Sequence, residues 1–393
     1  MTTDRWRLAC SECAATSTAD GLPTVCPDCG APWLVEYAHL PDLPASLARA
    51  QHGTAAADDP TTAWSMWRYR AWMPMDDGEE PVTLGEGMTP LLRAPRLERE
   101  LGIREVWIKD ESKNPTGSFK ARGLAAAVTR AALGGATAFT IPTAGNAGVA
   151  LSAYAQRAGI PARVYAPRTT PGTLLAQIRA FGATLELVDG HIGDCGRRSR
   201  ADAQQTGAYD VSTLREPYRI EGKKTLGLEL AEQFGWTLPD VILYPAGGGT
   251  GLIGMWKAFS ELRRAGWISS GLPRFYAVQS TGCAPVVRAF DSGAVRTEPW
   301  PDPDTVASGL RVPAPLGGVL MLRALRESGG GAIAVTDVAL TAAQRQLATR
   351  EGIDAAPEGG ATAAALAELR AEGTVREADR VVVFNTGAGW LYR

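Results

Sequence analysis

The chain has 393 residues, of which 45% are hydrophobic and 21% are charged, so it is long enough for two or three packed domains and is not expected to be disordered. Its 40 basic and 42 acidic residues almost balance, which argues against nucleic acid or an anionic membrane as a partner. Residues 1–8 contain an acid and no apolar stretch, and no later run approaches the roughly 18 apolar residues that span a membrane. We therefore expect a soluble, cytoplasmic protein.

Four of the six cysteines form two pairs near the N-terminus, namely Cys10, Cys13, Cys26 and Cys29. Thiolates at this C-x-x-C spacing fit a tetrahedral zinc ion, and a site closed by four cysteines is structural because catalytic zinc keeps one position open. With a strand-like segment at 33–35, residues 1–39 are predicted to form a zinc ribbon. Iron in the same site, two disulfides, or four unrelated thiols are the alternatives. The isolated Cys195 and Cys283 are expected to be small core residues.

From residue 40 to about residue 83 the periodicity weakens, and Trp64, Trp67 and Trp72 are expected to dock this linker on the protein body. Strand and helix signals alternate from residue 106 onwards. We predict strands at 106–109, 138–141, 162–165, 184–188, 241–244, 275–278 and 380–384. We predict helices beginning at 120 and 252, at 147–158 and 173–181, and ending near 206. This alternation indicates parallel sheets with helices on both faces.

Residues 114–123 read Asn-Pro-Thr-Gly-Ser-Phe-Lys-Ala-Arg-Gly and place Lys120 where a polar turn opens a predicted helix. An amine that forms a Schiff base must be held, partly desolvated, beside a carbonyl compound, and such a turn can do this. The strand at 241–244 runs into a second turn, which contains Gly247, Gly248, Gly249, Thr250 and Gly251. Backbone N–H groups at the start of the following helix would cradle a phosphate. A lysine and a phosphate cradle together indicate pyridoxal phosphate.

Two more loops follow predicted strands, at the edge where ligands bind to open parallel sheets. After the strand at 138–141 come Thr143, Ala144, Gly145 and Asn146. The Asn146 amide could bond the cofactor's phenolic oxygen or a substrate carboxylate, or could belong to a plain turn. After the strand at 380–384, the Thr386 hydroxyl could donate to an unprotonated pyridine nitrogen, or could belong to a strand-end turn.

The glycine turn also contains Gly249-x-Gly251-x-x-Gly254, the pattern of a dinucleotide-binding fold. That fold needs an acid at the end of the next strand, and here the strand ends in Gln279 and Ser280. A nicotinamide-dependent oxidoreductase is therefore a remote alternative. A P-loop fits less well, because Leu252 follows Gly251 where a lysine is required. A binding protein without enzymatic activity is a further alternative, and it would be colourless.

Taken with the segments 84–91 (Leu-Gly-Glu-Gly-Met-Thr-Pro-Leu) and 217–225, these motifs give a chain that resembles the threonine synthase family of fold-type II pyridoxal-phosphate enzymes over nearly its whole length. The resemblance implies an α/β fold like that of the tryptophan synthase β-subunit, with two parallel-sheet domains and the N-terminal zinc ribbon. The expected domains are the ribbon at 1–39, a linker and the first part of the large domain at 40–137, a small mobile substrate domain at 138–214, and the rest of the large domain at 215–393.

The resemblance also implies the roles of the site residues. The cofactor is bound covalently by Lys120 and contacted by Phe119, Asn146, Gly247, Gly248, Gly249, Thr250, Gly251 and Thr386. The substrate, a small amino acid, is contacted by Thr143, Ala144, Gly145 and Arg219. In this interpretation Arg219 grips a substrate phosphate, and the alternative is a surface arginine paired with Glu216 or Glu221. A homodimer is suggested by the family alone.

The chain departs from the family pattern at three places. Ala121 replaces an aspartate, the asparagine loop has lost hydroxyl groups at Ala144 and Ala147, and Thr213 and Leu214 replace an Asn-Ser pair. Each lost hydrogen bond to a charged group would cost about 1.5–3 kcal/mol, so the cofactor is better specified than the substrate. The expected reaction, in amino-acid biosynthesis, converts O-phosphohomoserine to threonine and phosphate. The alternative is β-elimination or β-replacement on serine, threonine or an O-phospho amino acid, as in dehydratases or cysteate synthase-like relatives.

Overall fold

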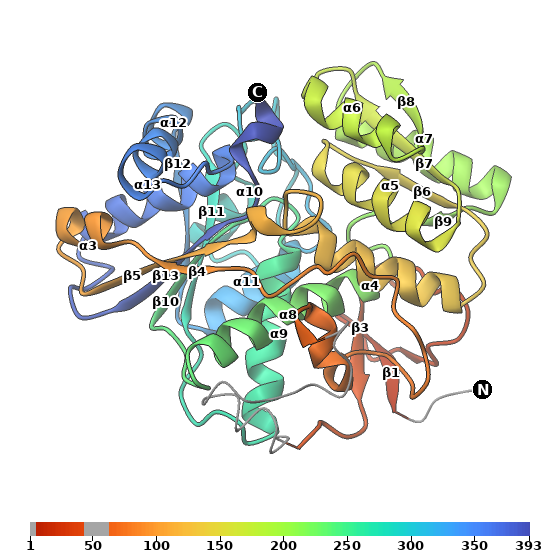
Figure 1. Cartoon of the computed structure of the whole chain (residues 1–393), viewed down its shortest axis with the longest axis horizontal. Coiled ribbons are helices and arrows are strands. Elements are labelled where there is room, and N and C mark those ends of the chain that lie inside the picture. Colours follow the sequence, from red (N-terminus) through yellow and green to blue (C-terminus); the bar gives the residue numbers. More distant parts are fainter. Residues whose placement is uncertain (1–4, 43–62) are drawn as a thin grey trace. The chain divides into compact units, whose positions relative to one another are not determined.

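Two parallel sheets and one small antiparallel sheet organise the residues that the computed structural model describes, which are 5–42 and 63–393 (Figure 1). These residues form two units, and each is described by itself. Unit 1 comprises the described parts of Met1–Met88, Lys120–Glu229 and Lys257–Ser269. Unit 2 comprises Thr89–Phe119, Leu230–Trp256 and Ser270–Arg393.

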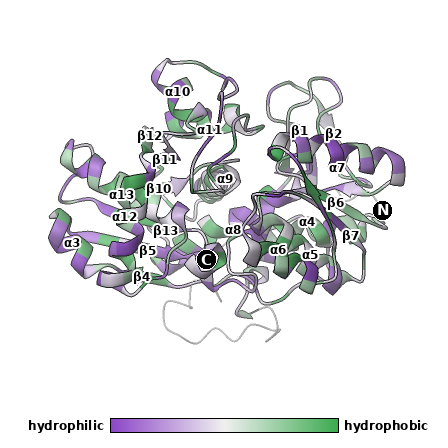
Figure 2. Ribbon diagram, turned by 90° about the horizontal axis from the view of Figure 1, so that it is seen from above, coloured by the Kyte–Doolittle hydropathy of each residue, from purple (hydrophilic) through white to green (hydrophobic). Residues whose placement is uncertain are grey.

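The parallel sheet of unit 1 has the strand order β8-β7-β6-β9. Its strands are β6 (Phe139–Pro142), β7 (Ala162–Pro167), β8 (Thr184–Val188) and β9 (Tyr209–Asp210). Helices α4 (Lys120–Leu133), α5 (Asn146–Ala158) and α6 (Gly172–Ala180) lie on one side of this sheet, and α7 (Ile192–Thr206) lies on the other (Figure 2). Leu124, Val128 and Ala131 share a buried face of α4, as their spacing predicts.

The ribbon of unit 1 is a three-stranded antiparallel sheet in the order β2-β1-β3. Its strands are β1 (Trp6–Cys10), β2 (Thr16–Ser17) and β3 (Trp33–Tyr37), so the predicted strand at 33–35 is present. Trp6, Leu8, Trp33 and Val35 alternate with more exposed residues and form a small core together with Tyr218. The ribbon therefore has its own apolar interior, and Tyr218 of α8 (Tyr218–Gln233) adds to it.

The segment before the lysine loop carries the three tryptophans that were expected to dock, and two of them do. Trp67 and Trp72 belong to the 3-10 helix η2 (Met66–Trp72) and are buried. Trp72 packs edge-on against Trp267, with ring centroids 5.0 Å apart. The expectation is wrong for Trp64, which lies ahead of this helix and is 78% exposed. Much of the linker, at 43–62, lies outside the described residues.

The sheet of unit 2 has the order β12-β11-β10-β13-β5-β4. Its strands are β4 (Leu91–Arg93), β5 (Glu105–Asp110), β10 (Val241–Pro245), β11 (Arg274–Ser280), β12 (Gly331–Val335) and β13 (Arg380–Asn385). All neighbours are parallel except β4, which pairs with β5 in the antiparallel sense. The predicted strands are therefore all present. The unpredicted β4, β9 and β12 are short or Gly/Ala-rich, so their local pattern is weak.

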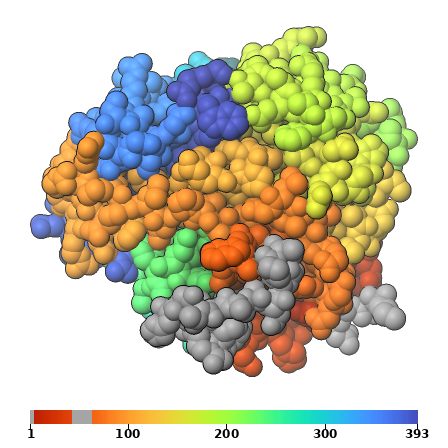
Figure 3. Space-filling model, in the orientation of Figure 1, coloured from red at the N-terminus to blue at the C-terminus, as the bar shows by residue number. Residues whose placement is uncertain are grey.

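Helices surround this second sheet. They are α3 (Pro95–Leu101), α10 (Pro285–Asp291), α11 (Gly318–Glu327), α12 (Asp337–Gln346) and α13 (Pro357–Ala371), with η3 (Glu111–Lys113), η4 (Leu347–Glu351) and η5 (Gly389–Tyr392). Helix α9 (Thr250–Arg264) follows β10. The C-terminal residues, dark blue in Figure 3, adjoin the lighter blue surface of α12 and α13. No described helix is both long and apolar enough to cross a membrane.

Strand order brings distant stretches of sequence together at one edge of unit 2. Leu243 of β10 pairs with Val383 of β13, and Asn385 of β13 pairs with Asp110 of β5. Since these strands are parallel, the loops that begin at 246, 386 and 111 leave the sheet side by side. Two of the three loops predicted to carry chemistry thus share an edge with the segment that leads to Lys120. The third, at 143–146, follows β6 in unit 1.

Candidate functional site

The segment 246–251, which comprises the turn after β10 and the first two residues of α9, has no room for a side chain at three of its glycines. A Cβ atom would lie 2.1 Å from the carbonyl oxygen of Gly309 if added to Gly247, and 2.2 Å from Sδ of Met321 if added to Gly249. At Gly251 it would lie 1.9 Å from Oη of Tyr244. The backbone therefore lines this turn at a helix N-terminus, as a phosphate cradle requires. We call residues 247–251 the phosphate cup.

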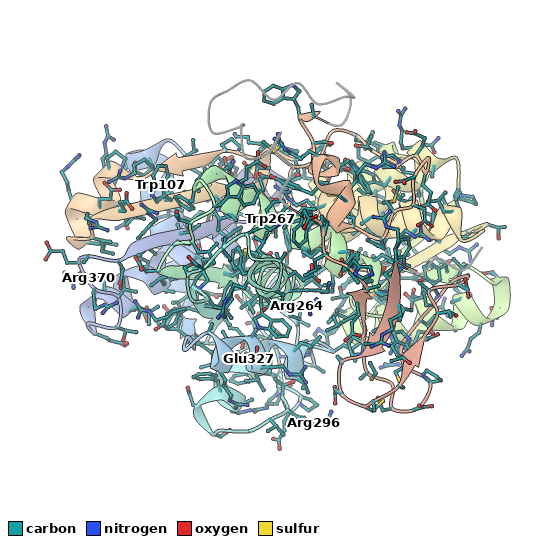
Figure 4. The ribbon with its side chains drawn as sticks, turned by 90° about the horizontal axis from the view of Figure 1, so that it is seen from below. Trp107, Arg264, Trp267, Arg296, Glu327 and Arg370 are labelled. Carbon is teal, nitrogen blue, oxygen red and sulfur yellow. The ribbon has the colours of Figure 1, made fainter. Side chains whose placement is uncertain are left out.

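Side-chain hydrogen bonds within unit 2 support the segments next to the cup. Nε1 of Trp256 on α9 donates to Glu327 on α11 over 2.9 Å, which ties these two helices together. Glu327 is labelled in Figure 4. Nε2 of Gln279 donates to the carbonyl oxygen of Ala246 over 2.8 Å. Oε1 of the same Gln279 accepts from the N–H of Val286 over 2.8 Å. Gln279 occupies the position where a dinucleotide fold needs an acid, and here its amide is structural.

The loop that leads to Lys120 is joined to the end of β13. The N–H of Phe119 donates to the carbonyl oxygen of Thr386 over 3.0 Å, and Nδ2 of Asn385 donates to Asp110 over 2.8 Å. The hydroxyls of Thr116 and Ser118 are buried and have no hydrogen-bond partner among the described residues. Buried orphan groups of this kind indicate a missing water or ligand. Together with the cup, they fit a bound molecule at this edge.

Lys120 is half-buried and begins α4 in unit 1. Only one peptide bond separates it from Phe119, so their Cα atoms lie about 3.8 Å apart. Its helix is anchored by a fully buried ion pair, in which Nη1 of Arg122 lies 2.8 Å from Oε2 of Glu229. Glu229 also accepts from the N–H of Met88 over 2.8 Å. The first turn of α4 is therefore anchored, and Lys120 is partly buried there, as a Schiff-base lysine needs to be.

The loop after β6 uses its threonine for its own structure. Oγ1 of Thr143 accepts from the N–H groups of Gly145 over 2.9 Å and Gly148 over 3.0 Å. Gly145 has a φ of +131°, and a Cβ there would lie 2.3 Å from Leu174. Ala144 carries no polar side-chain group, so it can offer a ligand only its backbone. The assigned contacts of Thr143, Ala144, Gly145 and Asn146 stay predictions.

Arg219 lies in the first turn of α8 and is only 1% exposed, so the alternative of a surface arginine is wrong. Its Nη1 donates to the carbonyl oxygen of Val211 over 2.9 Å, and its Nε has no hydrogen-bond partner among the described residues. Burial lowers the pKa of Arg219. Burial also raises the pKa of Glu216 to about 8, against the opposing charge of Arg219. Glu216 is then mostly neutral at neutral pH, and the arginine charge can attract an anion.

The four N-terminal cysteines gather their sulfur atoms within 4.8 Å of one another. The distances between sulfur atoms are 3.4 Å for Cys10 and Cys29, 3.7 Å for Cys13 and Cys26, and 3.6 Å for Cys13 and Cys29. A zinc ion with four bonds of about 2.3 Å would hold its sulfur ligands about 3.8 Å apart, whereas a disulfide needs about 2.05 Å. The cluster fits a tetrahedral metal and not two disulfides. Burial raises the pKa of the Cys10 thiol, but N–H donation from Glu12 and Cys13 outweighs it and lowers that pKa to about 7.

The two isolated cysteines, Cys195 and Cys283, are both fully buried, as expected of core residues. Sequence reasoning missed three side chains around the cup, namely Tyr244, Gln279 and Met321. The only signal for Tyr244 is its place two residues ahead of Ala246, and nothing local marks the other two. Their positions depend on which strands and helices become neighbours.

Known proteins are similar to most of this chain. The family described as pyridoxal-phosphate dependent enzyme matches residues 82–387. Threonine synthase of Methanosarcina acetivorans is 34% identical over 384 residues, which cover 97% of this chain and 91% of that protein. Threonine synthase of Methanocaldococcus jannaschii is 36% identical over 325 residues, covering 82% of this chain and 80% of that protein. A solved threonine deaminase from T.th. has a TM-score of 0.64 and 27% identity, covering 76% of this chain and 92% of its own.

Proposed function

The chain belongs to the threonine synthase family of pyridoxal-phosphate-dependent enzymes, and from this premise we propose that it converts O-phosphohomoserine and water to threonine and phosphate. It is a pyridoxal-phosphate-dependent lyase with the α/β fold-type II architecture that the motifs predict. The nicotinamide-dependent alternative is therefore wrong. The observation that carries the proposed substrate is the buried Arg219, whose Nε has no hydrogen-bond partner among the described residues, because this N–H group can donate to a phosphate.

The chain's residues divide the work of holding the cofactor. Lys120 would bind its aldehyde carbon, with Phe119 alongside. The phosphate would accept bonds from the N–H groups of the cup, residues 247–251, and from the Thr250 hydroxyl. Asn146 would bond the phenolic oxygen and Thr386 the ring nitrogen. When bound, pyridoxal phosphate supplies an electron-withdrawing ring that stabilises negative charge at the substrate Cα.

Lys120 is also the residue that moves protons. Its amine would remove the proton from the substrate Cα and would deliver protons along the carbon chain. Arg219 holds the phosphate as its bond to Cγ breaks, and the oxygen of a water molecule is added at Cβ. Thr386 donates a hydrogen bond without giving up a proton, whereas a carboxylate at that position would keep the ring nitrogen protonated.

A second candidate is β-elimination or β-replacement on serine, threonine or an O-phospho amino acid. Two observations favour it. Leu214, in place of a polar residue, is 1% exposed and offers no hydrogen bond. The Thr143 oxygen already accepts two backbone hydrogen bonds. Both changes reduce the polar groups that a phosphorylated four-carbon substrate could use.

The cofactor assignment predicts a yellow protein whose visible absorbance depends on Lys120. In Lys120→Ala we expect that band to be lost, because no other residue is proposed to bind the aldehyde. Lys113→Ala, at an exposed lysine earlier on the same loop, is the matched control and should keep it. A band that survives in Lys120→Ala would show that another amine holds the cofactor.

The substrate assignment is tested with O-phosphohomoserine, O-phosphoserine, serine and threonine, by measuring released phosphate, keto acid and threonine. We expect threonine and phosphate from O-phosphohomoserine. In Arg219→Met the KM for this substrate should rise about tenfold to a hundredfold, since a charged hydrogen-bonded pair is lost. Turnover of serine, which lacks phosphate, should change little. Keto acid from serine or O-phosphoserine without threonine would instead establish the second candidate.

We further propose that the enzyme acts in the cytoplasm, with zinc in the ribbon, as a homodimer. A metal cluster of reduced cysteines suits that compartment. Sedimentation velocity of the purified protein tests the dimer. We also propose that residues 138–214 form a small domain that closes on the substrate and excludes water. Crystal structures with and without an amino acid would test this, and identical positions of residues 138–214 would argue against it.

A further inference from the structure

Tyr244, the fourth residue of β10, is buried among three groups of unit 2. It is 1% exposed. Its ring lies edge-on to that of Phe119, with centroids 6.0 Å apart, and to that of Phe384, with centroids 5.1 Å apart. Its hydroxyl oxygen lies beside Gly251, at 1.9 Å from the point that a Cβ on that glycine would occupy. One side chain therefore contacts three separate segments.

Each of these segments leads directly to a residue of the proposed cofactor site. Phe119 precedes Lys120, Phe384 lies two residues before Thr386, and Gly251 closes the phosphate cup. Buried aromatic rings pack closely and in preferred orientations, so a shift of one ring displaces its neighbours. Tyr244 thus connects the part of the chain that would hold the cofactor's phosphate to the parts that would hold its aldehyde and its ring nitrogen.

We propose that Tyr244 is a positioning residue, which sets the spacing of the phosphate cup relative to the Lys120 and Thr386 segments so that all three can bind one cofactor molecule at the same time. This inference rests on the proposed pyridoxal-phosphate site. A molecule held at two ends binds far more tightly than either end alone, but only when the two binding groups are correctly spaced. Loss of that spacing should weaken the binding of the whole cofactor and leave the binding of its separate parts, pyridoxal and phosphate, almost unchanged.

The test compares Tyr244→Leu with the wild-type full-length chain, each freed of cofactor. Dissociation constants are measured for pyridoxal phosphate, for pyridoxal, and for inorganic phosphate. We expect the constant for pyridoxal phosphate to rise at least about tenfold, because misplacement by about 1 Å is enough for such losses. The constants for pyridoxal and inorganic phosphate should each change less than about twofold, because each binds at one end only.

Other results would overturn the inference. If the Tyr244→Leu change weakens the binding of inorganic phosphate as much as that of pyridoxal phosphate, Tyr244 only supports the fold of the cup. If the dissociation constant for pyridoxal phosphate does not change, Tyr244 has no positioning role. Tyr276→Leu is the matched control, since Tyr276 is a buried tyrosine on the neighbouring strand β11 of the same unit. Tyr276→Leu should lower the thermal stability and leave all three dissociation constants unchanged. If it raised the dissociation constant for pyridoxal phosphate as much as Tyr244→Leu does, the loss of binding would be a general result of disturbed core packing.

Two more variants keep the inference testable if Tyr244→Leu does not fold. Tyr244→Phe keeps both ring contacts and should hold pyridoxal phosphate within about threefold of the wild type, whereas a loss as large as tenfold would overturn a positioning role of the ring. Phe384→Leu removes one ring that supports Tyr244. It should weaken the binding of pyridoxal phosphate more than the binding of pyridoxal or inorganic phosphate. If the wild-type chain itself binds no pyridoxal phosphate, the proposed function fails; if it binds and the variants do not differ from it, only the positioning role fails.

Discussion

At the scale of single residues, burial changes what two neighbouring charged groups can do. Glu216 is 1% exposed and accepts from the N–H groups of Tyr218 over 2.8 Å and Arg219 over 3.1 Å. Even so, burial outweighs these favourable interactions and raises the pKa of Glu216 to about 8. A carboxyl that is mostly neutral at pH 7 leaves Arg219 with positive charge for a ligand, where an ionised carboxylate would have cancelled it.

This arrangement gives stability a particular dependence on pH. The pKa of Glu216 is about 8 in the folded chain against an ordinary value of 4.5, so its contribution is fully present below about pH 4.5 and is lost as the pH rises through about 8. Glu216→Gln imitates the neutral acid. As the pH rises from about 5 to about 9, we expect the thermal unfolding midpoint of this variant to rise relative to that of the wild type, because only the wild type loses the contribution of Glu216. Thermal melts across this range provide the measurement.

The control is Glu298→Gln, which changes an exposed acid of unit 2. Its unfolding midpoint should follow that of the wild type at every pH. Parallel curves for Glu216→Gln and wild type would mean that Glu216 is ionised in the folded chain. Arg219 would then be neutralised internally, and the argument for a substrate phosphate at this position would lose part of its support.

At the scale of elements, the start of α9 works because neighbouring segments approach the glycine backbone closely. Gly247 lies against the carbonyl oxygen of Gly309, whose own N–H donates to Glu358 over 2.6 Å. A backbone oxygen fixed in this way cannot move aside as the end of a flexible side chain could. The residues that limit the cup are therefore distant in sequence, and the cup's shape is a property of the packed element.

Gly247→Ala should deform the cup. The added methyl group would lie 2.1 Å from the Gly309 oxygen, and overpacking of this kind costs about 1–3 kcal/mol. We expect the dissociation constant for pyridoxal phosphate to rise about tenfold to a hundredfold, as measured by titration of the visible absorbance. Gly271→Ala is the control, because an added Cβ there meets nothing within 4 Å, and it should bind the cofactor normally. Normal binding by Gly247→Ala would mean that the phosphate lies elsewhere.

At the scale of the whole molecule, the ribbon is part of unit 1 and not an appended module. Oη of Tyr37 on β3 donates to Glu221 over 2.6 Å. Glu221 in turn lies 2.7 Å from Nζ of Lys224 and 3.0 Å from Nζ of Lys257, and all three are buried. Removing one member of such a buried charged group leaves the others unpaired, so the position of the ribbon affects the interior of the unit.

Removal of the metal should therefore lower the stability of unit 1 as well as that of the ribbon. Cys10→Ser combined with Cys13→Ser is expected to lose the zinc, of which the wild type should hold one ion per chain, and to melt at a lower temperature. Elemental analysis and thermal melts measure both effects. Cys195→Ala, at a buried cysteine outside the cluster, should keep the metal. A wild-type protein purified without metal would refute the zinc ribbon, and one purified with iron would change the identity of the ion.

Short motifs account for what the sequence by itself determined. The paired cysteines, the turn before Lys120 and the glycine turn after β10 each place their groups within a few residues, so backbone geometry alone brings those groups together. The alternation of strands and helices also indicated parallel sheets with helices on both faces, and the family resemblance implied two such domains. These local signals were enough for the fold class and for the cofactor.

Only the tertiary structure decided which distant segments meet. Buried strands such as β10 and β13 read as similar apolar runs, so nothing local says that they are neighbours. Their pairing places the cup beside the end of β13 and brings Tyr244 against both Phe119 and Phe384. The same holds for burial, which made Arg219 an interior charge and left Trp64 exposed. Burial depends on what covers a residue, and the covering groups come from elsewhere in the chain.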